Sequence, residues 1–171
     1  WEHTYHCANG EVHNLQNMAQ ALDNSCNLWF IQAAQTLQPT VFYDYIQAFG
    51  FTQPTGIDLP SETRWTSVYN AQQMAEVDTN LYTAAFGQNE AITPMQMATA
   101  NGGYLVTPYI VDSITDDAGN IISQTDTSVR RQVISEEVSQ EILSMMENNV
   151  EPNGTLSIRH SCKNAYVAGY R

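Results

Sequence analysis

The side chains in this chain that could do chemistry are mainly serine hydroxyls and carboxylates, and one serine stands in a triplet of interest, Ser25-Cys26-Asn27. A serine hydroxyl becomes an effective nucleophile only when a base lies beside it. Taken alone, a serine two residues before an asparagine is a weak signal, because both residue types are also common helix caps. The triplet therefore needs further context before it predicts a function.

The sequence lacks the motifs that usually activate a serine. Neither GxSxG nor SxxK occurs, and the one lysine of the chain is Lys163. In Ser161-Cys162-Lys163 the serine and the lysine are too close in sequence to lie one helical turn apart on the same face. We expect no activated serine within these 171 residues.

Pairs of carboxylates, the usual acids and bases of hydrolases, have structural explanations here. Asp116 and Asp117 stand in a predicted turn, and Glu136 and Glu137 stand at a predicted helix start. Aspartate is a common turn residue, and acidic residues near a helix N-terminus interact favourably with the helix dipole. We therefore do not expect these pairs to act as catalytic acids or bases.

The clustered histidines near the N-terminus do not form a recognisable metal motif. His3 and His6 are three residues apart, Glu2 and Cys7 are adjacent to them, and His13 follows. HExxH is absent, and the spacing matches no common zinc pattern. We predict no metal and no cofactor.

Cysteine usage does not indicate a disulfide framework. The three cysteines, Cys7, Cys26 and Cys162, are widely spaced and odd in number, so free or buried thiols are expected. A bridge between Cys7 and Cys162 stays open at this point.

The composition is that of an acidic globular domain. Six Lys and Arg face eighteen Asp and Glu, a net charge of −12, and 43% of the residues are hydrophobic. The basic residues near the C-terminal end, Arg159, His160, Lys163 and Arg171, are too few for a groove that binds nucleic acid, so no nucleic-acid partner is expected. No membrane span or signal peptide is apparent, and the two ends are interpreted as cut.

The apolar periodicity predicts the elements that must position these residues. Apolar residues at i, i+3, i+4 and i+7 predict helices over 15–22, 30–37 and 42–49. Asn14 is the expected cap of the first helix, Pro39 separates the second from the third, and Gly50 ends the third. Ser25 falls in the break between the first two helices, a natural N-cap position.

The rest of the chain predicts a helix-rich α+β unit without an obvious linker. We expect a loop over 51–66, a short helix over 71–75, and a helix that begins at Thr93-Pro94 and ends near 101–103. A β-hairpin is predicted with strands near 109–114 and 120–122, and a further strand over 129–134. A last helix is capped by Ser135 and ends at 152–154.

Four segments, in order, give the serine triplet its context. They are ALDNSCNLWF (21–30), FGF with TGIDLP and Glu62 (49–62), FGQNEAITPMQMATA (86–100), and Asn101-Gly102-Gly103 followed by Pro108. Together they resemble the transpeptidase domain of class B penicillin-binding proteins, the peptidoglycan D,D-transpeptidases of the division and sporulation type. The resemblance runs through almost all of the chain.

The resemblance implies a fold, a reaction and roles for two residues. It implies part of the penicillin-binding and β-lactamase-like fold, in which the SxxK serine attacks the D-Ala-D-Ala stem peptide and its lysine acts as base. Ser25 would relay protons and Asn27 would contact the substrate amide. The implied partners of the parent are the peptidoglycan stem peptide and β-lactams. The parent would be extracytoplasmic, and membrane-anchored only through segments outside this chain.

Departures from the family pattern limit the activity we expect. The SxxK segment should lie upstream of Trp1, and the KTG strand should follow residues 165–171. Ala100 abuts Asn101, where relatives have additional helical residues. We therefore interpret residues 1–171 as a partial transpeptidase domain, inactive and marginally stable by itself. The alternatives are a truncated non-catalytic binding or regulatory module, and a β-lactam sensor or β-lactamase relative.

Overall fold

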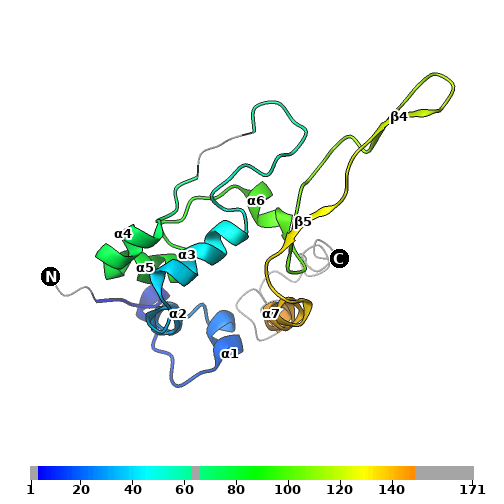
Figure 1. Ribbon diagram of the computed structural model, residues 1–171. Coiled ribbons are helices and arrows are strands. Elements are labelled where there is room, and N and C mark those ends of the chain that lie inside the picture. Colours follow the sequence, from blue (N-terminus) through cyan, green and yellow to red (C-terminus); the bar gives the residue numbers. More distant parts are fainter. Residues whose placement is uncertain (1–3, 63–65, 149–171) are drawn as a thin grey trace.

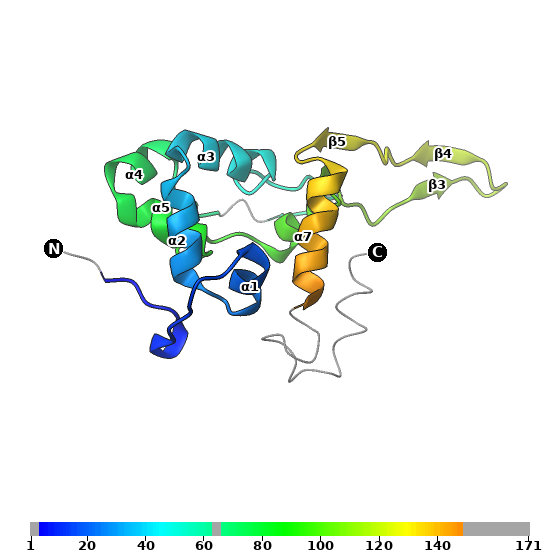
Figure 2. The ribbon, with the colours of Figure 1, turned by 90° about the horizontal axis from the view of Figure 1, so that it is seen from below.

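Seven α-helices, one 3-10 helix and five short strands form the described part of this computed structural model, residues 4–62 and 66–148. Figures 1 and 2 show a group of helices from the first half of the chain, with a long hairpin extending away from them. In chain order the elements are η1 (Ala8–Gly10), α1 (Met18–Asp23), α2 (Asn27–Gln35), α3 (Pro39–Ala48), α4 (Ala71–Glu76), α5 (Asp78–Ala85), α6 (Pro94–Thr99), β1 (Ala100–Asn101), β2 (Tyr104–Val106), β3 (Ser113–Thr115), β4 (Ile121–Gln124), β5 (Val129–Gln132) and α7 (Glu136–Asn148).

Four helices, α2 to α5, surround the main apolar core (Figure 1). Local signals set their boundaries: Pro39 is the first residue of α3, and Asn70 forms a capping box with Gln73 at the start of α4. Gly50, with φ +80°, ends α3 in the left-handed conformation. The buried residues of this core are Ala34, Ile46, Met74, Leu81 and Ala84.

A three-stranded antiparallel sheet, in the order β1-β2-β5, lies next to α6. Gly102 and Gly103 connect β1 to β2, and their φ values of +59° and +86° suit the tight turn of a two-residue hairpin. A Cβ atom on Gly103 would lie 2.7 Å from the Ile134 carbonyl oxygen, so this position excludes any side chain. Leu105 of β2 is buried, and its side chain packs against Gly50.

The β3–β4 hairpin projects from this sheet (Figure 2). Its strands pair antiparallel, with a bulge between Ile114 and Thr115. The turn is built around Asp116, whose carboxylate accepts hydrogen bonds from the backbone N–H groups of Ala118 and Asn120. The predicted hairpin and the structural use of Asp116 are confirmed, but the strands begin later than predicted, since residues 109–112 precede β3.

The first helix differs from its prediction. Leu15, expected on its apolar face, is fully exposed and lies before the helix. The cap is Asn17, not Asn14, because Asn17 and Gln20 form a reciprocal capping box at 3.0 Å each. The expected stripe of α2 is also partly wrong, since Leu37 lies beyond the helix end and Ile31 is buried instead.

Several other elements agree with the sequence-based expectations. Thr93 caps α6 with Gln96, Ser135 caps α7, and β5 lies within the predicted strand. Helix α5, the 3-10 helix and the β1–β2 pair were not predicted. The helix beginning at Thr93 ends at Thr99, because Ala100 and Asn101 are already paired with β2. The predicted end of the last helix at 152–154 lies outside the described residues.

The observed fold is helix-rich α+β with small antiparallel sheets, as predicted. Among the described residues, no helix is both long and apolar enough to cross a membrane.

Candidate active site

Ser25 lies in the turn that joins α1 to α2, and the backbone of that turn is tightly defined. The Ser25 N–H donates to the Leu22 carbonyl at 3.1 Å, and the Cys26 N–H donates to the Ala21 carbonyl at 2.9 Å. These two bonds form a Schellman motif, which ends a helix with one residue in the left-handed conformation. That residue is Ser25, with φ +49°.

The predicted role of Ser25 as an N-cap is wrong. Cys26, with extended backbone angles, is the N-cap of α2, and Ser25 follows the end of α1. A side chain in the left-handed region costs about 1 kcal/mol, and glycine usually takes this place. The Ser25 side chain is thus held in an unfavourable backbone conformation, a feature that often accompanies functional positions.

Asn27 is the first residue of α2, and its carboxamide is oriented by the N-terminal segment. Its Nδ2 donates a hydrogen bond of 3.1 Å to the backbone carbonyl of His6. Because that bond uses the amide NH₂ group, the Oδ1 atom is left as an acceptor for another donor. Asn27 is therefore prepared to accept a hydrogen bond from an N–H group of a ligand.

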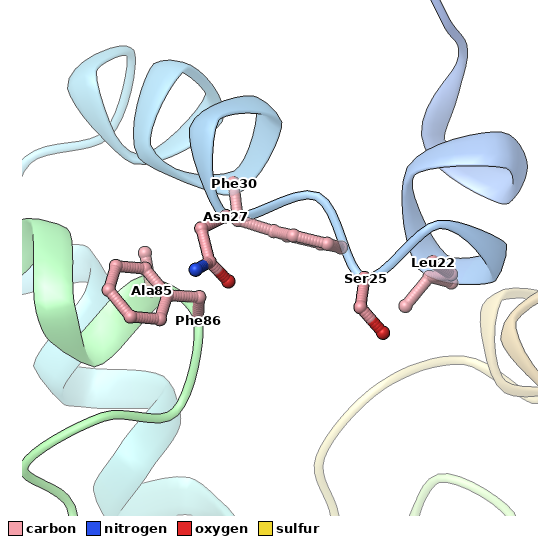
Figure 3. Close-up of a pocket in the computed structure, with 6 residues that line it drawn as sticks. All are labelled: Leu22, Ser25, Asn27, Phe30, Ala85 and Phe86. Atoms are coloured by element: carbon pink, nitrogen blue, oxygen red, sulfur yellow. The ribbon is translucent and has the colours of Figure 1, made fainter. Parts of the chain in front are cut away.

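Ser25 and Asn27 line the same cavity, of about 330 Å³. In Figure 3 their side chains point to one side of the α1–α2 turn, with Ala85 and Phe86 beside Asn27. Leu22 and Phe30 complete the lining. The cavity is mostly apolar with two polar groups, an arrangement typical of sites that orient a ligand.

The hydroxyl of Ser25 lacks a base in the described part of the chain. No hydrogen bond to its Oγ atom is formed within residues 4–62 and 66–148, and Ser25 is exposed. The single lysine of the sequence, Lys163, lies outside those residues. The described residues therefore place no nucleophile–base pair at this turn.

Cys26 of this turn belongs to a group of three side chains whose types can ligate a metal. The Sγ atoms of Cys7 and Cys26 are 3.5 Å apart, and the ligand atoms of Cys7, His13 and Cys26 all lie within 4.8 Å of one another. Both thiols are buried, and the His13 Nδ1 atom is buried without a hydrogen-bond partner in the described chain. Two other histidines lie near this segment in the sequence. His3 lies outside the described residues, and the backbone carbonyl of His6 accepts the hydrogen bond from Asn27.

Cys7 lies close to Cys26, a contact that the sequence did not predict. Both are free thiols that pack in one small core with Ala21. Cys162, the one partner that the sequence suggested for Cys7, lies outside the described residues. Sequence spacing gave no hint that Cys7 and Cys26 meet, because the contact depends on how the N-terminal segment folds back over α2.

The TGIDLP segment (55–60) and Glu62 do not line the cavity of Ser25 and Asn27, and two of their carboxylates form hydrogen bonds within the fold. Glu62 accepts hydrogen bonds from the Thr55 hydroxyl at 2.7 Å and the Gly56 N–H at 2.9 Å. Asp58 accepts bonds from the N–H groups of Ile110 and Val111, both at 2.8 Å. This loop therefore folds around Glu62 and holds the base of the hairpin through Asp58.

The hydrogen bonds of these two carboxylates lower their pKa values. For Asp58 the backbone N–H of Val111 is the main cause, followed by that of Ile110. For Glu62 partial desolvation raises the pKa, but the Thr55 and Gly56 hydrogen bonds outweigh it. Both groups are therefore held in the ionised form that their donors require.

Gln96 connects the helix α6 to the FGF segment. Its side chain, only 2% exposed, donates from Nε2 to the Gln53 carbonyl at 2.8 Å and approaches the carbonyls of Gly50 and Phe51. Its Oε1 accepts from the Thr93 N–H at 2.8 Å. Two of the segments quoted from sequence thus meet through one buried amide.

Glu90 is a half-buried residue that the sequence did not single out. Both of its oxygens are shielded from solvent and lack a hydrogen-bond partner in the described chain. Desolvation raises the pKa of Glu90 to about 7, with a small opposing effect from the nearby Tyr69 N–H. It lines a second cavity with Ser67, Tyr69 and Asn89.

The match to a known family extends over nearly the whole chain. A family model described as the penicillin binding protein transpeptidase domain matches residues 2–169. The chain belongs to this family. The matched range includes the four segments and the α1–α2 turn that carries Ser25 and Asn27.

Named relatives and a solved structure agree with the family. Stage V sporulation protein D of Bacillus subtilis is 35% identical over 168 residues, covering 93% of this chain and 24% of that protein. The peptidoglycan D,D-transpeptidase FtsI homolog of Mesostigma viride is 29% identical over 173 residues, covering 91% of this chain and 28% of that protein. A peptidoglycan synthetase structure from Bifidobacterium adolescentis superposes with a TM-score of 0.74 at 28% identity, covering 85% of this chain and 27% of that one.

The chain spans about a quarter of the length of the curated relatives it matches. The predicted family and fold class are confirmed by these matches. The roles of Ser25 and Asn27 stay predictions, as does the assignment of residues 1–171 to a partial domain.

Proposed function

We propose that the chain is part of a serine-type D,D-transpeptidase that cross-links peptidoglycan stem peptides and is acylated by β-lactams. The single observation that carries the proposal is the shared cavity of Ser25 and Asn27, in a chain that belongs to the penicillin-binding transpeptidase family. Residues 1–171 are then a partial domain, and the SxxK serine, its lysine and the KTG strand belong to the rest of the parent protein.

In this proposal Asn27 holds the substrate. Its amide nitrogen is engaged by the His6 carbonyl, so its Oδ1 accepts a hydrogen bond from a backbone N–H of the stem peptide. The apolar lining from Phe30 and Phe86 shields this bond from water. Asn27 thereby fixes the acyl group relative to the nucleophile.

Ser25 carries a proton. Its hydroxyl, exposed at the rim of the cavity, accepts the proton of the attacking serine through the base and passes it to the leaving amine. The left-handed turn sets where this hydroxyl lies relative to Asn27. Ser25 does not become acylated in this scheme, because no base lies beside it in the described chain.

The same proposal specifies where the parent protein is located and which ligands it binds. Stem peptides and β-lactams are its ligands, and it works outside the cytoplasmic membrane, anchored by segments that are not among these 171 residues. Nucleic acid is not a partner, consistent with the net charge of −12.

The experiment is acylation of the parent protein by a fluorescent penicillin. We expect Ser25→Ala and Asn27→Ala each to slow acylation by about 100-fold or more, the usual size of a lost proton-transfer or positioning group. Asn24→Ala is the matched control, because Asn24 is exposed and its side chain bonds only to Gln16 in the described chain.

Two results would contradict the proposal. Unchanged acylation in both variants would remove Ser25 and Asn27 from the site. A parent protein with no SxxK serine, and no covalent adduct, would leave the non-catalytic binding module as the better description.

A further inference from the structure

The β3–β4 hairpin carries large apolar side chains that the rest of the described chain leaves uncovered. Ile114, Ile121 and Ile122 are 53%, 64% and 67% exposed. Every residue of both strands is exposed. Three more exposed apolar residues lie at the base of the hairpin, namely Tyr109, Ile110 and Val111. A group of this kind, projecting from the body (Figures 1 and 2), marks an interaction surface.

Hydrogen bonds fix the hairpin at its base and at its tip. At the base, Asp58 accepts hydrogen bonds from the N–H groups of Ile110 and Val111, and the Thr125 N–H donates to the Asp112 carbonyl at 2.8 Å. At the tip, Asp116 accepts three hydrogen bonds from the turn. A surface held in this way loses little conformational freedom on binding.

The hairpin also offers unpaired strand edges. Within the described residues β3 pairs only with β4, and β4 only with β3. Each strand therefore has an outer edge whose backbone N–H and C=O groups are free to pair with another chain. A two-stranded sheet is marginal in water by itself, and a third strand stabilises it.

The charge on this segment defines the chemistry of a partner. Residues 104–129 contain no lysine or arginine and four aspartates, Asp112, Asp116, Asp117 and Asp126. A second copy of the chain would bring four more aspartates to the same place and a net charge of −12, so self-pairing is opposed by repulsion. A basic segment is attracted instead.

We propose that the β3–β4 hairpin is a docking strand pair for an extended, basic polypeptide segment of another protein. The partner adds a strand to one free edge, packs its apolar side chains on the exposed isoleucines, and places lysine or arginine near the aspartates. This surface is separate from the cavity of Ser25 and Asn27, so the proposal stands independently of the transpeptidase reaction.

The test uses the full 171-residue chain and two labelled peptides, one alternating lysine with valine and one alternating glutamate with valine. We expect the lysine peptide, and not the glutamate peptide, to bind the chain, as measured by fluorescence anisotropy. Its affinity should fall when salt is added, because salt screens the attraction between opposite charges. The double variant Ile121→Thr with Ile122→Thr, which keeps β-branched residues in the strand, should weaken binding by about tenfold or more.

Val12→Thr is the matched control, since Val12 is equally apolar and 89% exposed but lies far from the hairpin in sequence. Hydrogen exchange on the complex should show new protection of backbone amides in β3 or β4. The proposal is overturned if both peptides bind alike, if the isoleucine variant binds normally, or if no strand amide gains protection. Self-association of the chain that the isoleucine variant abolishes would assign the surface to a second copy and would equally overturn it.

Discussion

Ser25 and Gly50 occupy the same position at the ends of two different helices. In each case the residue after the helix cap has a positive φ, +49° for Ser25 and +80° for Gly50, and two backbone bonds close the Schellman motif. Glycine meets no steric penalty there, whereas serine does. Serine at this position therefore makes the fold less stable than glycine would, but it supplies the hydroxyl that the proposed function needs.

The first prediction follows from that comparison. Ser25→Gly should raise the free energy of unfolding by about 1 kcal/mol, because the backbone keeps its conformation and loses the Cβ penalty. Ser25→Ala removes the hydroxyl but keeps the Cβ atom, so it should not stabilise the chain. Thermal or urea unfolding of the two variants measures the difference. Equal stabilities of the glycine and alanine variants would mean that the turn is not strained.

A second prediction concerns the buried amide of Gln96. Gln96→Leu has a similar volume but leaves the Gln53 carbonyl and the Thr93 N–H without their partner. We expect a loss of about 3 kcal/mol in urea unfolding, since each buried unsatisfied group costs roughly 1–3 kcal/mol. Gln72→Leu, at an exposed site, should change stability by less than about 0.5 kcal/mol. Similar losses in the two variants would argue against the special role of Gln96.

The third prediction is a pH dependence set by Glu90. Its folded pKa of about 7 lies above its ordinary value, so the folded chain binds the proton more tightly than the unfolded chain. Stability therefore falls as the pH rises from the unfolded pKa, near 4.5, through about 7, and stays lower above that.

Glu90→Gln should remove this fall and stabilise the chain at about pH 8 by about 1 kcal/mol, because partial exposure screens much of the penalty. Urea unfolding at about pH 5 and about pH 8 measures the effect. The control is Glu76→Gln, at an exposed carboxylate on α4. If Glu90→Gln leaves the slope of stability against pH unchanged, the carboxylate is not desolvated in solution.

At the scale of elements, the loop over 51–62 connects parts of the chain that are far apart in sequence. Asp58 reaches the hairpin base, and Arg130 and Arg131 of β5 donate to the carbonyls of Thr55 and Gln47. Polar contacts with backbone groups thus attach the hairpin base to this loop, and β5 to the loop and to α3. These contacts explain structurally why Asp58 stands in this loop.

The fourth prediction tests that attachment. Asp58→Ala should speed amide exchange at Ile110 and Val111, because both N–H groups lose their acceptor. Asp117→Ala, at the exposed hairpin tip, should leave these amides unchanged. The lowered pKa of Asp58 means that its contribution is present above the unfolded pKa, near 4, and is lost as the pH falls through the folded value. Identical exchange in both variants would show that the Asp58 contact is not formed in solution.

Elements with a local signal could be predicted, and those that depend on distant partners could not. Thr93-Pro94, Ser135 and the turn at Asp116 carry their own capping or turn chemistry, and the structure confirms all three. Helix α5 has a weak apolar periodicity, and strand β2 is only three residues long, so tertiary packing decides both. For the site, the sequence placed Ser25 between two helices, but its backbone conformation depends on the bonds to Ala21 and Leu22.

At the scale of the whole molecule, many large apolar side chains of the described residues are exposed. Exposed aliphatic and aromatic residues occur on α2, α3, α6 and the hairpin. An apolar cavity of about 300 Å³ also opens between Phe49, Met97 and Leu143. Such surfaces are usually covered by other parts of a domain or by partners.

The fifth prediction concerns this chain alone. We expect no covalent adduct with a fluorescent penicillin after denaturing electrophoresis, because no serine among the 171 residues has the SxxK lysine. We also expect marginal stability, seen as a broad, low-temperature melt. A stable adduct mapped to any serine of this chain would refute the first expectation, and a sharp melt at high temperature would refute the second.

The pairing of Val106 with Val129 means that the chain leaves the three-stranded sheet and returns to it at one point. Residues 107–128, which include the whole hairpin, therefore connect two strand ends that lie next to each other in the sheet. Replacing them with a tight asparagine–glycine turn would join β2 directly to β5 without altering the ladder. Because the two strand ends are already adjacent, we expect this point of the sheet to accept a longer, shorter or exchanged connection.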